Sequence, residues 1–444
     1  MNNDNIAAIS TAAGAAGVAV IRISGSSPLS VAEKLFRPLG KTPVKDFVPN
    51  FMYTGEIDAG EFKDFGLCVY FKAPKSFTGE DTVEFHSHGG VAVSRGILKK
   101  ILASGARLAK NGEFTRRAFL NGKLSLASSE GLIDMINAES VAGVKAGYSL
   151  YREKLTGEVT VMQEELTAAL SQIDADMDFP EEGLEETSRE AVKAALASVT
   201  EKTEKLLATF KTGSRVKNGV KVGIVGKPNV GKSSLLNALL GFDKAIVSET
   251  AGTTRDVVEG ATDISGVRFF LSDTAGIRET SDGIEGFGVA LSKKALNEND
   301  ILLFLVAAGE VSREDEEVYS LCKDKNVLFI VNKCDKSEGK DGRADIYLSA
   351  KTGEGIEKLK ELLYEKTVGE TDLNGDFLCE ERHFEALTRA KNSLLSAAGG
   401  VETEPLDVLA VDITAAWRNL GEITGKTASE EIIDDIFSRF CVGK

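Results

Sequence analysis

The sequence predicts a multidomain protein with an N-terminal α+β domain, a discontinuous all-α helical domain and an α/β phosphate-loop (P-loop) domain inserted into the helical one. At 444 residues the chain is too long for a single hydrophobic core. Short apolar runs that alternate with helical segments begin abruptly near residue 221, and helical spacing of apolar residues lies on both sides of them. We therefore place the domains at 1–121, at 122–213 together with 378–444, and at 214–377.

The N-terminal part mixes strand and helix patterns. Apolar and β-branched side chains dominate residues 18–23, 66–71 and 82–85, which we predict to be strands. Residues 91–102 place their apolar side chains at helical spacing. Such a mixture is typical of an α+β domain.

Two features of this part admit a functional interpretation. His86 and His88 form an HxH pair, but no third metal ligand stands nearby in sequence, so we interpret the pair as a turn before Gly89 and Gly90. Residues 94–123 carry one acid, Glu113, and eight basic side chains, which are Arg95, Lys99, Lys100, Arg107, Lys110, Arg116, Arg117 and Lys123. They predict either a solvated helix face or a surface for phosphate or carboxylate groups.

The helical stretches are residues 124–211 and 380–440, where apolar side chains recur three and four positions apart. Because the two ends of a domain usually lie close together, a domain inserted at a helix–helix loop disturbs its host little. We therefore expect the two stretches to form one helical domain. Their leucine and methionine stripes are the core of a helix bundle.

Composition limits the possible function classes. No apolar run of 18 or more residues occurs, so we expect no membrane span, and Met1–Ser10 has no signal-peptide pattern. The five cysteines are scattered without CxxC spacing, which favours a reducing, cytoplasmic location. The formal charge of −15 argues against indiscriminate binding of polyanions.

Residues 226–233 (GKPNVGKS) match the phosphate-loop pattern GxxxxGKS. They follow an apolar strand, 222–225, and precede a helical segment, which is the context that the motif requires. In such a loop backbone N–H groups converge on phosphate oxygens. Lys232 is expected to reach the β- and γ-phosphates, and the Ser233 hydroxyl to bind Mg²⁺.

Two further segments identify the nucleotide. Asp273 ends a predicted strand and opens the sequence DTAG, the second switch segment, where a carboxylate can hold the magnesium shell. Asp335 in the sequence NKCD can accept hydrogen bonds from guanine N1–H and its 2-amino group. Adenine lacks that pair of donors and would leave a buried carboxylate unpaired. The sequence therefore predicts a GTPase.

The predicted contacts to GTP comprise the phosphate loop, the two switch segments and two base-reading segments. They are Asn229, Val230, Gly231, Lys232, Ser233, Ser234, Ser248, Glu249, Thr250, Ala251, Gly252, Thr253, Thr254, Asp273, Thr274, Ala275, Gly276, Asn332, Lys333, Asp335, Ser349, Ala350 and Lys351.

One expected group is missing from this set. Ile277 follows DTAG, where Ras-type GTPases place a glutamine that orients the attacking water, and no arginine finger is evident. Another cation must then assist hydrolysis. The Asn229 amide oxygen and backbone carbonyls near residues 248–256 could form a cage for K⁺, with the Thr254 hydroxyl on Mg²⁺. The alternative is that Asn229 only braces the loop.

These motifs resemble those of the TrmE-Era-EngA-type GTPases. The matching segments are GKPNVGKSS, AGTTRD, DTAGIRET and NKCD. Outside them, VIRISG at 20–25, SFTGED at 76–81, RAFLNGK at 117–123 and the final CVGK resemble the tRNA-modifying branch of that family, along essentially the whole chain.

The resemblance implies a K⁺-stimulated GTPase that uses a formyl- or methylene-tetrahydrofolate. It further implies a homodimer that works with an FAD-containing partner, MnmG (GidA), to modify carbon 5 of the tRNA wobble uridine. Residue by residue it implies folate contacts at Arg22, Glu84, Lys123 and Lys444. It implies K⁺ contacts at Asn229, Ser248, Thr250 and Thr253, and Mg²⁺ contacts at Ser233 and Thr254. Catalytic roles fall to Glu285, Lys232 and Cys441. Glu285 would order the hydrolytic water in place of the group missing at Ile277. For Cys441 a role as a nucleophile and a role in packing both stay open.

The main alternative is an Era- or EngA-like ribosome-assembly switch without modification activity. Those proteins carry a KH-like RNA-binding module or a second GTPase domain. Here the sequence has one phosphate loop, no GxxG segment typical of KH modules after residue 377, where the predicted GTPase domain ends, and the CVGK ending. A purely structural GTPase is a third interpretation.

Overall fold

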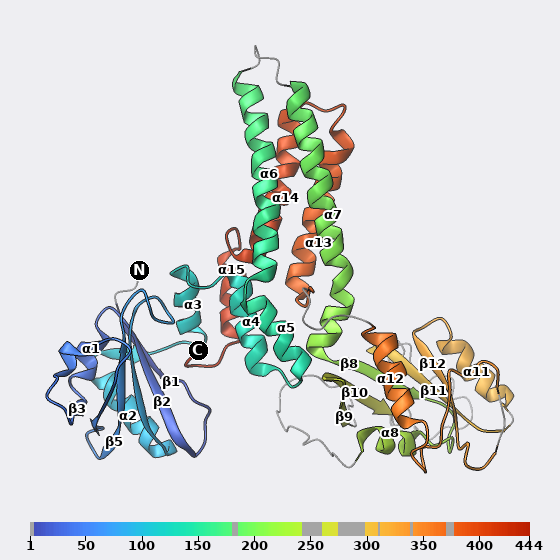
Figure 1. Cartoon of the computed structure of the whole chain (residues 1–444), viewed down its shortest axis with the longest axis horizontal. Coiled ribbons are helices and arrows are strands. Elements are labelled where there is room, and N and C mark those ends of the chain that lie inside the picture. Colours follow the sequence, from blue (N-terminus) through green and yellow to red (C-terminus); the bar gives the residue numbers. More distant parts are fainter. Residues whose placement is uncertain are drawn as a thin grey trace, which may run out of the picture. The chain divides into compact units, whose positions relative to one another are not determined.

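The computed structural model describes residues 4–179, 185–241, 260–273, 298–309, 311–337, 341–369 and 377–444 (Figure 1). The chain divides into two compact units. The first unit comprises Met1–Ile133, Leu150–Val192 and Gly399–Lys444, and the second comprises Asp134–Ser149 and Lys193–Ala398. Each unit combines one β-sheet with helices.

The first unit contains a seven-stranded sheet with strand order β3-β4-β5-β6-β2-β1-β7. Its strands are β1 (Asn5–Ile9), β2 (Ala16–Gly25), β3 (Phe36–Pro38), β4 (Met52–Asp58), β5 (Lys63–Phe71), β6 (Asp81–Gly89) and β7 (Ala106–Leu108). Neighbouring strands are antiparallel except β1 and β7, which are parallel. The helices α1 (Pro28–Ala32), α2 (Val91–Ala103) and α3 (Glu113–Leu120) accompany the sheet.

Alternation along β2 explains how this sheet presents polar groups. Ile21 and Ile23 are fully buried in a core that also includes Ile97 and Ile101 of α2. Because successive strand residues point to opposite faces, Arg22 lies on the face away from that core. The strand and helix predicted over 82–85 and 91–102 are confirmed, with longer bounds.

The HxH pair is not in a turn. His86 and His88 both lie within β6, which runs on to Gly89. The predicted turn is therefore wrong, because the strand continues through both histidines to pair with β2 as far as Ala16.

The helical part is formed by α4 (Leu126–Asn137), α5 (Val141–Tyr151), α6 (Lys154–Asp178), α7 (Glu185–Asn218), α13 (Glu381–Gly400), α14 (Leu406–Thr424) and α15 (Glu430–Ser438). Within the first unit α6 packs against α14. Gln163 Nε2 donates to the carbonyl of Trp417 over 3.0 Å, and Trp417 Nε1 donates to Thr167 over 3.1 Å. None of the helices in the described ranges has the length and apolar character that crossing a membrane requires.

The second unit contains a six-stranded sheet with order β13-β12-β11-β8-β10-β9. Its strands are β8 (Val220–Val225), β9 (Gly260–Ile264), β10 (Val267–Asp273), β11 (Ile301–Ala307), β12 (Val327–Asn332) and β13 (Ile346–Tyr347), and its helices include α8 (Lys232–Leu240), α11 (Arg313–Cys322) and α12 (Ile356–Thr367). Five strands are parallel, as the apolar runs predict. The edge strand β9 differs: it forms an antiparallel hairpin with β10 through a turn at Ser265 and Gly266.

Candidate functional site

The phosphate loop joins β8 to α8 in the second unit. β8 ends at Val225 and α8 begins at Lys232, so the motif lies at the carboxyl edge of a parallel strand and leads into a helix N-terminus. Gly231 has φ of 105°, and a Cβ placed there would lie 2.3 Å from Asn332 Nδ2. Only glycine fits this position, which explains the second glycine of the motif.

Lys232 folds back over its own loop. Its Nζ donates to the carbonyl oxygens of Gly226 and Lys227, at 3.0 and 2.9 Å. Ser233 follows it in the first turn of α8 and is exposed. The positive charge, a hydroxyl and the helix N-terminus thus meet at one place, which is the set that binds a phosphate with its magnesium ion.

Asn332 connects three segments that are far apart in sequence. It ends β12 and is 2% exposed. Its Nδ2 donates to the carbonyl of Val230 over 2.9 Å, and its Oδ1 accepts from the backbone N–H of Ala350 over 3.0 Å. The side chain therefore holds the phosphate loop beside both base-reading segments. Lys333 adds a second bond to the loop, from its Nζ to the carbonyl of Asn229 over 2.5 Å.

Asp335 is held by the other base-reading segment. Its Oδ1 accepts from Ser349 Oγ over 2.7 Å, and Ser349 is fully buried. That hydrogen bond lowers the pKa of Asp335 below its usual value, so the carboxylate is ionised and accepts hydrogen bonds only. Asp335 is exposed in this structure, three residues beyond the end of β12.

Most of the switch residues lie outside the described residues. These are Ser248, Glu249, Thr250, Ala251, Gly252, Thr253, Thr254, Thr274, Ala275, Gly276, Ile277 and Glu285. Asp273 is the last residue of β10, and only its backbone is described. In the sheet, β8 lies between β10 and β11. The position of Asp273 at the carboxyl end of β10, beside the end of β8, agrees with the place expected for a magnesium-shell carboxylate.

A second candidate site lies on the sheet of the first unit. Arg22 of β2 and Glu84 of β6 are directly opposite each other, and Arg22 Nε donates to Glu84 Oε1 over 2.7 Å. The rings of Phe77 and Phe114 flank the guanidinium at 5.4 and 5.6 Å. The resemblance named Arg22 and Glu84 but neither ring, although Phe77 lies inside the matched segment SFTGED.

His86 adds to the charge of this site. Its Nε2 lies 3.5 Å from Glu84 Oε2. Burial alone would raise the pKa of Glu84, but His86 and Arg22 together outweigh it and hold that pKa below its usual value. A carboxylate that stays ionised beside two aromatic rings suits a flat ring with N–H donors. Of the remaining predicted folate contacts, Lys123 donates from Nζ to the carbonyl of Pro74 over 3.1 Å.

Comparison with known proteins shows the family to which the chain is related. A family model described as the MnmE helical domain matches residues 126–441, and one described as the GTP-binding protein TrmE N-terminus matches residues 5–123. The tRNA modification GTPase MnmE of Desulforamulus reducens is 41% identical over 461 residues and covers 100% of each chain. That of Caldicellulosiruptor saccharolyticus is 38% identical over 455 residues, again covering 100% of each. The chain belongs to the MnmE family.

This assignment rests on the sequence relatives. A solved G domain of the T. maritima FeoB iron transporter is 26% identical and covers 33% of this chain and 98% of its own, with a TM-score of 0.25. The MnmE match runs through all predicted domains, including the CVGK ending. It therefore favours a tRNA-modifying family member over the Era- or EngA-like alternative.

The MnmE-family tail packs on the sheet of the first unit. Ser10 Oγ donates to the carbonyl of Gly443 over 3.1 Å, and Val442 forms a short antiparallel bridge with Asn111. Cys441 is exposed and lines a cavity of about 420 Å³ together with Ala8. Ala8 is the β1 residue opposite Arg22, but neither Arg22 nor Glu84 lines the cavity. Lys444, the fourth predicted folate contact, ends this tail and donates its backbone N–H to the Cys441 carbonyl over 3.3 Å.

In the second unit, ion pairs fix α7 where the chain enters the GTPase sheet. Arg215 donates to Asp300 over 2.8 Å and to the carbonyl of Thr367 over 2.9 Å. Lys217 pairs with Asp134 at 2.7 Å and also with Glu380, close to where the chain returns to the helices. α7 is one continuous helix through residue 213, where we place a domain boundary, and it ends only two residues before β8.

Two carboxylates sharing one lysine make this junction pH-sensitive. Burial and the charge of Glu380 raise the pKa of Asp134 to about 7, against the opposing effect of Lys217. Between pH 4, near the ordinary pKa of an aspartate, and pH 7, Asp134 is therefore protonated in the folded state and ionised in the unfolded state. The resulting stability is present at low pH and is lost as pH rises through about 7.

We accordingly expect Asp134→Asn to reduce the pH dependence of unfolding. The free energy of unfolding of the unmodified protein, relative to that of the variant, should decline between about pH 5 and pH 7.5, with a slope of at most about 1.4 kcal/mol per pH unit. Parallel denaturant titrations of both proteins measure the difference, which cancels titrations that they share. A difference that stays constant over this range would contradict the prediction.

Proposed function

We propose that this chain is a magnesium-dependent, potassium-stimulated GTPase that modifies carbon 5 of the wobble uridine in tRNA. It would do so in the cytoplasm, as a homodimer and with an FAD-containing MnmG partner. The observation that carries the GTPase part is the side chain of Asn332, which joins the phosphate loop to both base-reading segments. Membership of the MnmE family supports the tRNA part. For the domains we propose the boundaries 1–121, 122–213 with 378–444, and 214–377.

Different residues of the GTPase domain would bind the phosphates, the magnesium ion, the attacking water and the guanine base. Lys232 would leave the carbonyls of Gly226 and Lys227 to neutralise the β- and γ-phosphates. Ser233, with Thr254, would hold magnesium, which supplies charge compensation at the transferred phosphate. Glu285 would order the attacking water. Asp335, kept ionised by Ser349, would accept the two guanine donors.

The potassium site would be built around Asn229. This residue has φ of 62° and an exposed side chain, and Lys333 fixes its carbonyl. An asparagine tolerates this backbone conformation better than most residues, and its exposed side chain carries an amide oxygen of the kind that binds cations. The carbonyls of Ser248, Thr250 and Thr253 would complete the cage.

The Arg22–Glu84 pair and the tail would form a folate site. Arg22 and Glu84 are bonded to each other, so both would contact the same end of the ligand, between Phe77 and Phe114. Lys123 and Lys444 would then bind the folate carboxylates, and Cys441 would lie at the cavity that it lines together with Ala8.

Potassium dependence tests the proposed hydrolysis most simply. A cation in the finger position contributes about 10³–10⁵ in rate in related enzymes. We therefore expect steady-state GTP hydrolysis to be at least about tenfold faster in KCl than in NaCl at equal ionic strength. Asn229→Gly, which keeps the positive φ but removes the amide, should abolish this difference while GDP binding stays unchanged. Equal rates in the two salts would reject the potassium site.

A further inference from the structure

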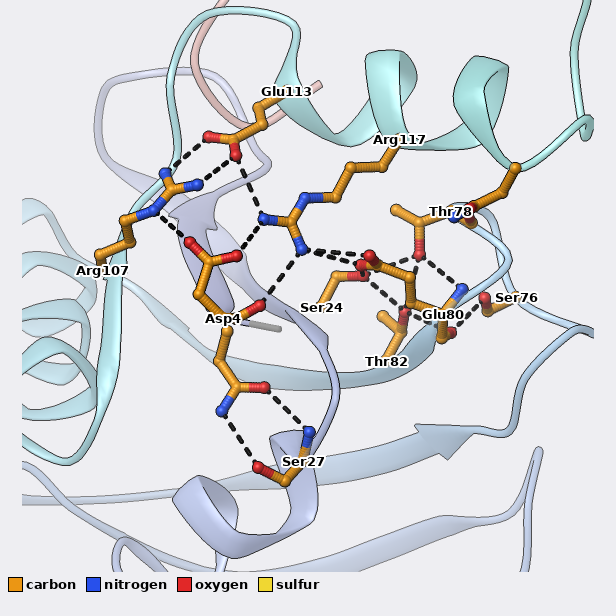
Figure 2. Close-up of polar contacts among 12 residues, drawn as sticks. Asp4, Ser24, Ser27, Ser76, Thr78, Glu80, Thr82, Arg107, Glu113 and Arg117 are labelled. Atoms are coloured by element: carbon orange, nitrogen blue, oxygen red, sulfur yellow. Dashed lines mark hydrogen bonds and ion pairs between the residues drawn. The ribbon is translucent and has the colours of Figure 1, made fainter. Parts of the chain in front are cut away.

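The first unit contains a partly buried ion cluster that the GTPase chemistry does not use. We define the ion cluster as Asp4, Glu80, Arg107, Glu113 and Arg117, which Figure 2 shows converging from the residue before β1, the loop before β6, β7 and α3. The Arg117 side chain is buried among these acids, so the interpretation of the basic stretch 94–123 as a solvated helix face does not apply to it. Arg107 is 38% exposed and pairs with two of the same acids.

Arg117 is the centre of the ion cluster. Its side chain is 8% exposed and its two terminal nitrogens reach three acids. Nη1 donates to both carboxylate oxygens of Glu80, each at 3.1 Å, and Nη2 donates to Asp4 over 2.7 Å and to Glu113 over 3.2 Å. Arg107 holds Asp4 and Glu113 from the other side, with Nε at 2.6 Å from Asp4.

Glu80 connects Arg117 to the loop that contains Phe77. Besides Arg117, it accepts from Ser24 Oγ over 2.8 Å, and Ser24 in turn contacts Thr78 Oγ1 at 2.7 Å. The backbone N–H of Glu80 donates to the same Thr78 hydroxyl over 3.2 Å, and Asn121 Nδ2 donates to the Thr78 carbonyl over 2.7 Å. Residues 76–80 are therefore fixed at several points, and Figure 2 shows those at Ser76, Thr78 and Glu80.

Both rings that flank Arg22 are attached to this ion cluster. Phe77 lies three residues before Glu80 on the fixed loop, and Phe114 directly follows Glu113 on α3. Ser24, which Glu80 binds, lies two residues after Arg22 on the same face of β2. The ion cluster thus positions Phe77, Phe114 and strand β2 around the Arg22–Glu84 pair, and none of the contacts described above joins it directly to that pair.

Stability alone does not explain such an arrangement. A buried ion pair costs so much desolvation that a well-packed apolar cluster of equal volume is often at least as stable. The charges instead fix orientation, because the planar guanidinium of Arg117 holds Glu80, Asp4 and Glu113 around it in one geometry. A binding site made of two rings and a guanidinium needs these groups held in fixed relative positions, and the ion cluster can supply this.

We propose that Glu80 and Arg117 are positioning residues for ligand binding: their ion pair fixes Phe77 against Arg22 and so sets the affinity for a pterin ring. This inference rests on the proposed folate site. The ligand itself would contact Arg22, Glu84 and the two rings, while the ion cluster acts through them.

Glu80→Gln tests the inference because it keeps the size of the side chain and its bond from Ser24 while it removes the charge. A hydrogen bond to a charged group contributes about 1.5–3 kcal/mol, so the Kd for 5-formyl-tetrahydrofolate should rise about 10- to 100-fold, measured by calorimetry on the full-length protein. Asp64→Asn is the matched control, because Asp64 is a carboxylate of the same sheet that binds His88 at 2.6 Å outside the ion cluster. Its Kd should equal that of the unmodified protein, and GTP hydrolysis should be unchanged in both variants.

A double-mutant cycle separates positioning from general destabilisation. Phe77→Leu should weaken binding with the ion cluster intact, and adding Glu80→Gln should then cost much less than it does alone, because the residue through which it acts is gone. Arg117→Lys, which keeps the charge but not the planar guanidinium that reaches three acids, should give an intermediate Kd. If the unmodified protein binds and the two changes are additive, or Glu80→Gln binds normally, the positioning role is wrong. If the unmodified protein does not bind this folate, the proposed folate site fails, and the inference fails with it.

Discussion

Asp335→Asn should change the preferred nucleotide of this protein from GTP to xanthosine triphosphate. The aspartate carboxylate accepts from guanine N1–H and the 2-amino group, whereas an asparagine amide can donate to the oxygen that xanthine carries in place of that amine. The amide retains an oxygen for Ser349, so the local contact at 2.7 Å can persist. Sites built to bond a polar group reject analogues lacking it by about 10⁴–10⁵. We therefore expect the ratio of kcat/KM for the two nucleotides to shift by about 10⁴ or more.

Asp341→Asn provides the control for this experiment. Asp341 is a nearby carboxylate in the same unit, paired with Arg343 at 2.7 Å and outside the base-reading segments. Its replacement should leave the nucleotide preference unchanged. An unchanged preference for GTP in Asp335→Asn would remove Asp335 from base recognition.

Removing residues 441–444 should abolish wobble-uridine modification and leave GTP hydrolysis nearly intact. The tail is bound within the first unit, to Ser10 and Asn111, whereas the phosphate loop belongs to the second unit. Its loss would remove Cys441 from the cavity beside Ala8 and Lys444 from the proposed folate site. Both effects act on the one-carbon chemistry.

Cys441→Ser divides the two roles left open for this cysteine. The serine keeps the size and the exposed position but is a far weaker nucleophile at neutral pH. If the thiol is a nucleophile, the single change should abolish modification as completely as the deletion does. If it only packs, modification by Cys441→Ser should stay within about twofold of normal, since surface substitutions cost little. Product formation in a reconstituted reaction with tRNA, GTP, folate and the MnmG partner measures this.

The phosphate loop and the base-reading segments were predictable because each is a short motif whose conformation is local. Gly231 and Lys232 must take their positions wherever a strand leads through such a loop into a helix. The contact of Asn332 with Val230 was not predictable from either motif alone, because it depends on β12 and β8 entering one sheet on either side of β11. The edge strand β9 escaped prediction because its sequence, GATDI, has no apolar run.

The N-terminal domain was less accessible to sequence reasoning. Arg22 and Glu84 are 62 residues apart, and only the antiparallel register of β2 with β6 places them opposite each other. Arg117 belongs to a stretch that is almost purely basic, so its acidic partners Asp4 and Glu80 could not be found by local charge counting. A buried ion cluster assembled from four segments leaves no spacing signal in the chain.

The nucleosides of bulk tRNA test the central claim, that GTP hydrolysis by this chain drives wobble-uridine modification. We predict that cells lacking the protein lose the aminomethyl- or carboxymethylaminomethyl-type uridines, that the unmodified gene restores them, and that a Lys232→Ala gene does not. Liquid chromatography with mass spectrometry of digested tRNA measures all three. A normal nucleoside profile in cells lacking the protein, or full restoration by Lys232→Ala, would contradict the account.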